Sequence, residues 1–317
     1  MNDNYIVSSA PHMRDKINTS RIMLDVIIAL LPTIGTGIWF FGYRAGLIVF
    51  ISVVSAMLFE FLFNKFLNRK STIWDLSAIV SGIILSLNLP VTVPLWLPVV
   101  GSFFMIIIVK MLFGGLGQNF INPAAAARAF LVISWPSLMS VWVFPFTKLD
   151  ILTNPDVISV ATPLAIVKDN LASASVKIPT YLDLYFGNVA GCIGEVSAFA
   201  LLLGGLYLLY RRVIDWRAPL TYISTVFILS ACFGGDPVYH VLSGGLLLGA
   251  IFMATDYPTS PITPVGRLFF GVGLGVLTIL FRFAGKGAEG VCYAILLMNV
   301  IAPLIDKLTA PRRFGMR

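Results

Sequence analysis

Charged residues are scarce in this sequence: they make up 12% of the 317 residues, whereas soluble domains carry about 25%. Hydrophobic residues make up 58%, and the mean hydropathy is +0.90. This composition leaves too little charge to cover a water-soluble surface, which excludes an ordinary soluble domain. We therefore expect an all-α polytopic membrane protein in contact with lipid, because a helix satisfies its backbone hydrogen bonds within one segment.

Cysteine and histidine are also scarce. Cys192, Cys232 and Cys292 stand singly in apolar segments, and His12 and His240 are isolated from each other. Zinc and iron–sulfur sites need clustered thiolate or imidazole ligands. We therefore expect no metal site made by this chain alone, and we expect the cysteines to be small buried side chains.

We expect no secretory signal, since the N-terminal stretch is polar where a signal would be apolar. The net charge is +7. In a membrane protein, such an excess of basic residues typically marks the cytoplasmic loops. We therefore expect no nucleic-acid partner.

Ten apolar segments come close to the length of about 20 residues that a helix needs to cross a bilayer. The third is short and ends at Leu89–Pro90, so we expect it to be broken or tilted. The expected spans are 22–42, 45–64, 76–89, 95–113, 123–144, 187–209, 218–234, 238–255, 265–281 and 288–306.

The basic residues are distributed unevenly between the two sides of these spans. With the N-terminus inside, 15 of the 22 lie on the inner side, Lys110 among them, and six on the outer side, including Arg44 and Arg282. The remaining one, Arg128, lies within a span. Because basic loops stay in the cytoplasm, both termini are expected to be cytoplasmic. Loop 145–186 then lies on the extracytoplasmic side.

Two segments resemble each other: SGIILSLNLPVTVP at 81–94 and SGGLLLGAIFMATDYPTSP at 243–261. Each begins with Ser-Gly and ends in a Thr/Ser cluster flanked by proline. A copy of five spans has an odd number of crossings, so the second copy would be inverted. Chance recurrence is the alternative. We expect an N-terminal membrane repeat over 1–144 and a C-terminal membrane repeat over 187–317.

The stretch GGLGQNFINPAAAARAF at 114–130 is unusually rich in small residues. Its glycines permit a left-handed backbone, and Asn122–Pro123 can start a new helix. The alanines that follow let another helix or a flat ligand approach closely. One interpretation is a turn followed by a close-packed helix, and the other is a re-entrant segment that contacts a cofactor.

Several ionisable residues lie in or near the spans, where a charge is costly and commonly paired or functional. Internal salt bridges are one explanation, and a cation path is the other. The candidates for an ion path are Asp25, Glu60, Arg128 and Glu195, with Asp256 at a span end. Glu195 lies near the expected start of a helix, at an interfacial position. No pairing among these residues can be chosen from the sequence.

The stretch DVISVATPLA at 156–165 interrupts the apolar pattern. Pro163 can be the first residue of a helix, with Thr162 as its N-cap. A plain helix cap is the simplest interpretation. A phosphate at such a position would lie at the positive end of a helix.

Four residues of this stretch match D-x-x-[ST]-x-A-T, the pattern at which a flavin transferase esterifies FMN phosphate onto threonine: Asp156, Ser159, Ala161 and Thr162. Val157 and Val160 stand where that motif usually has glycine. With this motif and ten spans, the chain resembles the RnfD/NqrB family of flavoprotein subunits. The resemblance, closer to RnfD, is carried by SSAPHMR, GGLGQNFINPA, GEVSAFALLLGGLYLL, GGLLLGAIFMATDYPTSP and GAEGVCYAILLMN.

The resemblance implies a subunit of an ion-translocating ferredoxin:NAD+ oxidoreductase in the bacterial cytoplasmic membrane, coupled to Na+ or H+ and not catalytic alone. It implies FMN bound covalently to Thr162 and a second, non-covalent flavin, riboflavin, in the membrane part. Its partners would be iron–sulfur, FMN- and NAD-binding subunits and a flavin transferase. The family fold resembles the inverted five-helix repeat of urea channels.

Two other functions stay open. A small-solute channel or secondary transporter would equally carry inverted repeats and buried charges. A structural scaffold for redox partners is the third. A plain channel has no use for the flavinylation motif, which is the discriminating feature, and a scaffold predicts that Thr162→Val leaves electron transfer intact.

Overall fold

The structure is a computed structural model that describes residues 18–69, 72–147, 160–168, 179–285 and 290–311. Every secondary-structure element in those ranges is a helix. The first half of the chain forms α1 (Thr19–Phe41), α2 (Tyr43–Phe66), η1 (Ile73–Asp75), α3 (Ser77–Leu87), α4 (Trp96–Phe103), η2 (Phe104–Met111), α5 (Pro123–Ser134) and α6 (Pro136–Met139).

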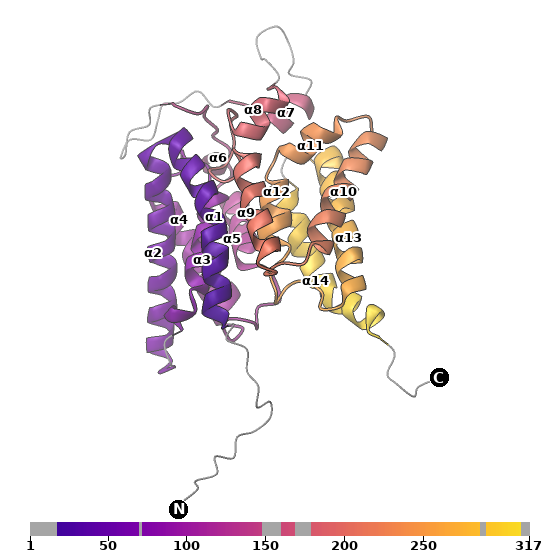
Figure 1. The fold of residues 1–317 in the computed structure, drawn as a ribbon. Helices are drawn as coiled ribbons and strands as arrows, with labels where there is room; N and C mark the ends of the chain where they lie inside the picture. The colour runs from indigo at the N-terminus through magenta and orange to yellow at the C-terminus, as the bar shows by residue number, and fades with distance from the viewer. Residues whose placement is uncertain (1–17, 70–71, 148–159, 169–178, 286–289, 312–317) are drawn as a thin grey trace, which may run out of the picture.

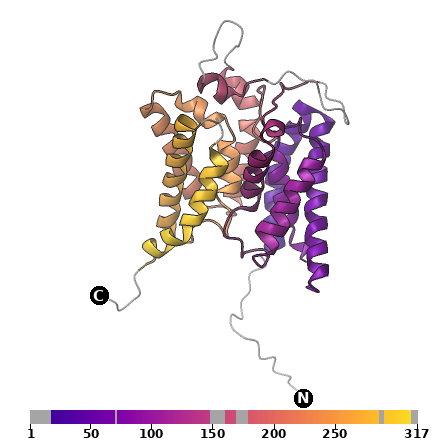
Figure 2. The same cartoon turned by 180° about the vertical axis from the view of Figure 1, so that it is seen from behind.

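The second half lies beside the first (Figures 1 and 2). Two short helices, α7 (Pro163–Lys168) and α8 (Tyr181–Phe186), lie between the halves in sequence and sit at one end of the bundle. The second half then forms α9 (Ala198–Tyr210), α10 (Arg217–Cys232), α11 (Pro237–Leu242), α12 (Leu246–Leu248), η3 (Gly249–Met253), α13 (Pro264–Ala284) and α14 (Val291–Thr309).

Four helices of the described residues, α1, α2, α13 and α14, are long and apolar enough to cross a membrane. The shorter apolar helices are α3, α4 continued by η2, α5, α9 and α10. Large apolar side chains point outward from the long helices, as lipid contact requires. Examples are Trp39, Phe50, Phe269 and Val300. The long apolar helices and their exposed apolar side chains therefore support the expectation of an integral membrane protein.

Every expected span contains helix, but three are shorter or more broken than expected. In segment 123–144, α5 ends at Ser134 because Pro136 follows and cannot donate a backbone hydrogen bond. In segment 187–209, α9 begins only at Ala198, after a run of turns. In segment 238–255, Gly244 and Gly245 take positive φ values of 70° and 66° and separate α11 from α12.

The packing of the two halves is similar in kind. In the first half α2 packs on α3 and α4, and in the second half α10 packs on α11 and α13. Asp75 accepts the backbone N–H of Ser77 just before α3, and Asp236 accepts that of Val238 at the start of α11. Helices α1 and α9 approach so closely that a Cβ on Gly204 would lie 2.2 Å from the Ala29 carbonyl oxygen.

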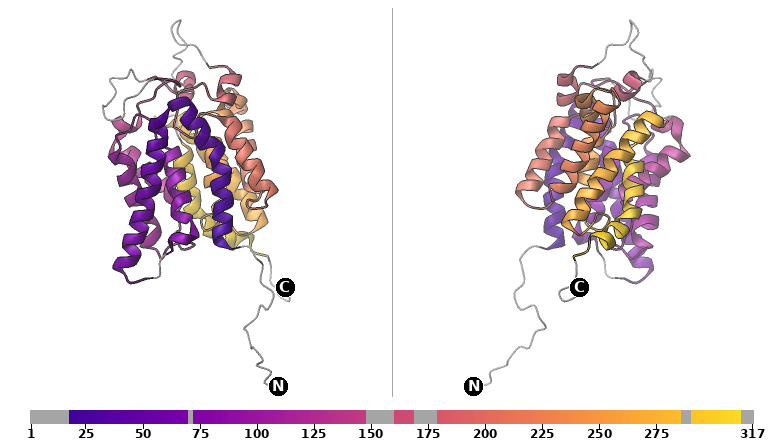
Figure 3. Two further views of the ribbon diagram at one scale, coloured as in Figure 1. Left: turned by 60° about the vertical axis from the view of Figure 1, so that its left-hand side comes forward. Right: turned by 90° about the vertical axis from the view of Figure 1, so that its right-hand side faces the viewer.

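The two ends of the bundle differ. Helix α1 begins and α14 ends at one end, and α7 and α8 lie at the opposite end (Figures 1 and 3). The expected topology requires this arrangement, since an even number of crossings returns the chain to its starting side.

Some residues lie elsewhere than expected. Arg44, Lys110 and Arg282, which the sequence assigns to the two sides of the membrane, lie within helices and are buried. Arg44 and Arg282 donate to backbone carbonyls freed where helices break, those of Val91 and Ser243 among them. Of the cysteines, Cys192 and Cys292 are buried as expected, but Cys232 is exposed at the end of α10.

Candidate functional site

Thr162 stands directly before α7, as the sequence predicts. The helix begins at Pro163, and the Thr162 hydroxyl accepts the backbone N–H of Ala165 at 3.4 Å. Thr162 and its neighbour Ala161 are half-buried. The other two motif residues, Asp156 and Ser159, lie outside the described residues.

Helix α7 is held against α8 and α11. Leu184, Val189 and Tyr239 form a small buried cluster beneath it. The Tyr239 hydroxyl donates to the Pro163 carbonyl at 3.2 Å. Helix α8 is itself fixed by a capping box, in which the Thr180 hydroxyl accepts the Asp183 N–H and the Asp183 carboxylate accepts the Thr180 N–H. The Thr180 hydroxyl also donates to that carboxylate, and this bond holds the pKa of the Asp183 carboxyl below its usual range. Helix α7, which Thr162 caps, is therefore packed against α8 and α11.

A cleft opens beside Thr162 and holds an empty volume of about 380 Å³. We call it the Thr162 cleft. It combines one side of α7 with residues preceding α9 and with the break between α11 and α12. Its lining is Thr162, Pro163, Leu164, Leu184, Val189, Ala190, Gly191, Glu195, Val196, Leu242, Ser243 and Gly244. Glu195 is the acidic residue in this lining.

Glu195 forms an ion pair with Arg128, and the two atoms, Oε1 and Nη1, are 3.0 Å apart. The two side chains are only 7% and 5% exposed. Arg128 also donates to Asn88 Oδ1 at 2.8 Å and to Cys192 Sγ at 3.4 Å. The structure thus joins two of the four predicted ion-path residues, a pairing that the sequence could not specify.

Glu195 lies near the start of a helix, as the sequence predicts. Glu195 precedes α9 in a buried turn, and the backbone around it packs on the end of α3. Gly194 N–H donates to the Leu87 carbonyl at 2.8 Å, and Ile193 N–H donates to the Leu89 carbonyl at 3.1 Å. A Cβ on Gly194 would lie 2.5 Å from the Leu87 Cβ, which explains the glycine and the burial of its neighbour.

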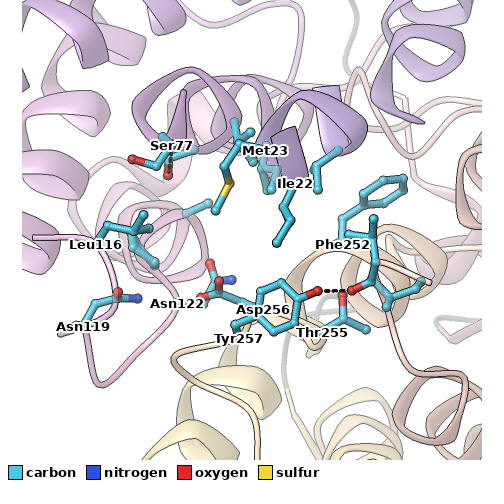
Figure 4. A pocket seen from close by; sticks show the side chains of 18 of the residues that line it. Ile22, Met23, Ser77, Leu116, Asn119, Asn122, Phe252, Thr255, Asp256 and Tyr257 are labelled. Carbon is cyan, nitrogen blue, oxygen red and sulfur yellow. Dashed lines mark hydrogen bonds between the residues drawn. The ribbon is translucent and has the colours of Figure 1, made fainter. Parts of the chain in front are cut away.

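A larger cavity lies between the halves, nearer the opposite end, with an empty volume of about 770 Å³. We call it the central cavity. Figure 4 shows Ile22 and Met23 of α1 on one side of it and Asn122 and Asp256 on the other. Its further polar lining includes Ser77, Lys110 and Asn119.

The stretch around Asn122 folds as predicted and supplies one wall of the central cavity. Gly114, Gly115 and Gly117 take positive φ values between 87° and 119°. Asn122 caps α5 by accepting the Ala125 N–H at 3.0 Å and donates to the Met253 carbonyl at 3.1 Å. The close-packed helix is therefore present, and its first turn also lines the central cavity.

The two other predicted ion-path residues are paired as well. Glu60 accepts from Lys110 Nζ at 2.8 Å, and the side chains are 0% and 3% exposed. Lys110 donates in addition to Ser77 Oγ at 2.6 Å. Asp25 accepts from Arg211 at 3.2 Å and from the Tyr207 hydroxyl at 2.9 Å, in a more open position. Internal salt bridges therefore exist at all four positions.

Sequence reasoning did not assign Lys110, Asn88 or Cys192 to a site. Lys110 carried a usable signal, because it is a charge inside the apolar segment 95–113. Asn88 and Cys192 carried none, since their contacts with Arg128 depend on how distant segments meet. Among the described residues, no group of three or more His, Cys, Asp or Glu side chains could hold a metal ion.

The model of the NQR2, RnfD, RnfE family matches residues 6–315 of this chain. The chain is 48% identical to the D subunit of the Na+-translocating ferredoxin:NAD+ oxidoreductase complex of Acetobacterium woodii, over 99% of this chain and 96% of that protein. It is 42% identical to the proton-translocating counterpart of Clostridium ljungdahlii, over 99% and 97%. It is 36% identical to the D subunit of the ion-translocating oxidoreductase complex of Salmonella paratyphi A, over 98% of each chain.

Proposed function

This chain belongs to the NQR2, RnfD, RnfE family, and we propose that it is the D subunit of an Rnf-type ferredoxin:NAD+ oxidoreductase. In that complex it would couple electron transfer to the translocation of Na+ or H+, and it would not be catalytic alone. The full-length match to proteins of that name carries the proposal. Iron–sulfur, FMN- and NAD-binding subunits are its proposed partners, because its relatives are named as subunits of such a complex.

We propose that FMN is esterified to Thr162 by a flavin transferase. The residue fits such a group: Thr162 is half-buried and lines a cleft, and the hydrogen bond of its hydroxyl is an accepting one that an ester oxygen retains. When bound, the flavin supplies electron transfer. The chain's own residues hold the acceptor threonine on an ordered helix and place a carboxylate, Glu195, in the same cleft.

The central cavity is the proposed site of the non-covalent riboflavin. It combines apolar side chains, which a flat ring can pack against, with the amides of Asn119 and Asn122, which suit a ligand rich in hydrogen-bonding groups. A lining mostly apolar with a few polar groups is typical of cofactor sites. The alanines at the start of α5 allow close approach to the backbone.

The membrane architecture that fits best is ten spans arranged as an inverted repeat of five, resembling urea channels. Two observations support this architecture. Helix α2 packs on its neighbours in the first half as α10 does in the second half, and the chain breaks after α3 in one half and after α11 in the other. The proposed repeats are 1–144 and 187–317, joined by the extracytoplasmic flavin-bearing loop 145–186. In this topology α8 is extracytoplasmic and the end of α9 is cytoplasmic.

Cysteine labelling tests the topology. In a background with Cys232→Ser, Leu182→Cys in α8 should react with an impermeant maleimide in intact cells, because its side chain is exposed. Tyr210→Cys, at the exposed end of α9, should react only after permeabilisation. The reverse pattern would place the flavin loop in the cytoplasm.

A small-solute channel or secondary transporter is less well supported. In the first half, the end of α3 contacts Arg128 through Asn88, and in the second half the start of α12 approaches Glu195. A buried ion pair therefore lies where the two broken helices face each other, at the place where a solute would cross. The ion path through Asp25, Glu60, Arg128 and Glu195 remains a proposal, with each charge held by a partner.

Inverted membrane vesicles carrying the whole complex test the proposed function. Reduced ferredoxin should drive NAD+ reduction and ion uptake together in vesicles that contain this chain, and both should be absent when the chain is deleted. Na+ and H+ are separated by adding a protonophore, which abolishes H+ accumulation and leaves Na+ accumulation. Solute flux without ferredoxin-dependent NAD+ reduction would instead indicate a channel.

A further inference from the structure

We propose that a cavity between α7, α11 and α13 binds the phosphate group of an anionic phospholipid. We call it the basic cavity, and it holds an empty volume of about 940 Å³. Its apolar lining includes Val167 and Phe283, and its polar side chains are Lys168, His240 and Arg282. Two of these are cations, and no acidic residue belongs to the lining. The basic cavity therefore suits a negatively charged ligand.

The two cations are held in place by uncharged acceptors. Lys168 at the end of α7 donates to the Gly285 carbonyl at the end of α13. Arg282 donates to the carbonyls of His240 and Ser243 at 2.5 and 3.0 Å. A carbonyl dipole orients a cation without cancelling its charge, and Arg282 is only 3% exposed, so water screens it weakly. Phosphate oxygens form strong, charge-assisted hydrogen bonds with such cations.

His240 points to a ligand independently of these charges. It is only 6% exposed, and its ring stacks on that of Phe283 with 5.4 Å between the centroids. A Cβ on Gly235 would lie 2.9 Å from His240 Nε2, so the glycine makes room for the imidazole. The other ring nitrogen, Nδ1, is buried without a hydrogen-bond partner among the described residues. A phosphate oxygen in the basic cavity would accept from Nδ1 and remove the cost of leaving it unpaired.

The acidic residue at the start of α11, Asp236, is engaged away from the basic cavity. Its carboxylate caps the helix by accepting the N–H groups of Val238 and Tyr239 at 3.0 and 3.1 Å. It also accepts the hydroxyl of Tyr181 in α8. These bonds hold the carboxylate at the α8 side of α11, and Asp236 does not line the cavity.

The basic cavity lies at the level where a membrane phosphate is expected. Helices α10 and α13 pack together, and both end at the end of the bundle that carries α7 and α8 (Figure 1). Large apolar side chains on their outer surfaces are exposed, among them Ile228 and Leu280. The rings of Phe233 and Phe283 are exposed near the helix ends, and their centroids are 5.5 Å apart. A phospholipid can therefore lay its acyl chains along α10 and α13 and place its phosphate among the cations.

Native mass spectrometry of the detergent-solubilised, flavin-free full-length chain tests this site. The chain should bind dioleoylphosphatidylglycerol more tightly than dioleoylphosphatidylcholine or dioleoylglycerol, which have the same acyl chains without the net negative charge. Lys168→Gln should weaken phosphatidylglycerol binding about tenfold, because hydrogen bonds between charged groups are strong, and Lys168→Arg should retain it. His240→Leu should weaken it about fivefold. Lys65→Gln, which removes an exposed cation at the end of α2, is the control and should change nothing.

Competition identifies the source of the phosphate. Inorganic phosphate should displace phosphatidylglycerol only weakly, because it lacks acyl chains, and binding as tight as that of the lipid would overturn the lipid assignment. Equal affinity for the three lipids, or wild-type affinity in both Lys168→Gln and His240→Leu, would overturn the site itself. The flavinylated protein should bind phosphatidylglycerol as the flavin-free protein does. Loss of lipid binding on flavinylation would assign the basic cavity to the flavin instead.

Discussion

Thr162→Val should abolish the covalent flavin completely. The wild-type protein, co-expressed with a flavin transferase, should give a fluorescent band on a denaturing gel, and the variant should give none. The reason is chemical: the phosphoester needs the threonine hydroxyl, and valine matches its shape without offering an oxygen. The fold should survive, because the lost cap hydrogen bond is 3.4 Å long and caps typically contribute about 1 kcal/mol.

Thr180→Val is the matched control for this experiment. Thr180 also caps a short helix at the same end of the bundle, and it lies outside the motif and outside the Thr162 cleft. Its fluorescence should equal that of the wild type. A dark wild-type band with an active transferase present contradicts covalent attachment. Equal fluorescence of Thr162→Val and wild type would place the flavin on another residue.

The same gel experiment reports on the second flavin. The Thr162→Val protein should still be yellow when purified under native conditions, because the central cavity is formed by residues far from α7. Denaturation should release that colour as free riboflavin. A colourless Thr162→Val protein would contradict a non-covalent flavin in the membrane part.

Local features of the fold could be predicted from the sequence because they depend on neighbouring residues. Pro163 and Pro123 start their helices as expected, since proline suits the first turn and the preceding Thr or Asn caps it. The left-handed turn around Gly115 was predicted for a similar reason. The sequence does not predict the late start of α9. The residues before Ala198 are as apolar as a membrane span, but they form turns whose backbone is hydrogen-bonded to the end of α3.

The site was predictable only in part, for a different physical reason. A linear motif makes Thr162 a candidate, and Arg128 and Glu195 are candidates because charge is rare in apolar segments. Their pairing depends on the approach of α5 to the turn before α9, which no local pattern encodes. The need for glycine at the α11–α12 break is visible only in the structure, because a Cβ at Gly244 would collide with Leu164 and a Cβ at Gly245 with Glu195.

Lys110→Met should be the most destabilising of the single substitutions considered. It leaves Glu60 fully buried without its counter-ion, and breaking a buried pair on one side costs about 3–5 kcal/mol. The free energy of unfolding, measured by reversible SDS titration in mixed micelles, should fall by that amount. Lys65→Met, an exposed residue next to the end of α2, is the control and should change it by less than about 0.5 kcal/mol.

The double variant Glu60→Met/Lys110→Met decides what the pair is for. Removing both charges leaves no unpaired ion, so most of the lost stability should return. If Glu60 belongs to the ion path, this stable double variant should still fold and assemble but should lose ferredoxin-driven ion uptake in vesicles. Wild-type ion uptake by the double variant would show that the pair is a structural salt bridge. Stability and transport then separate the two explanations of buried charge that the sequence leaves open.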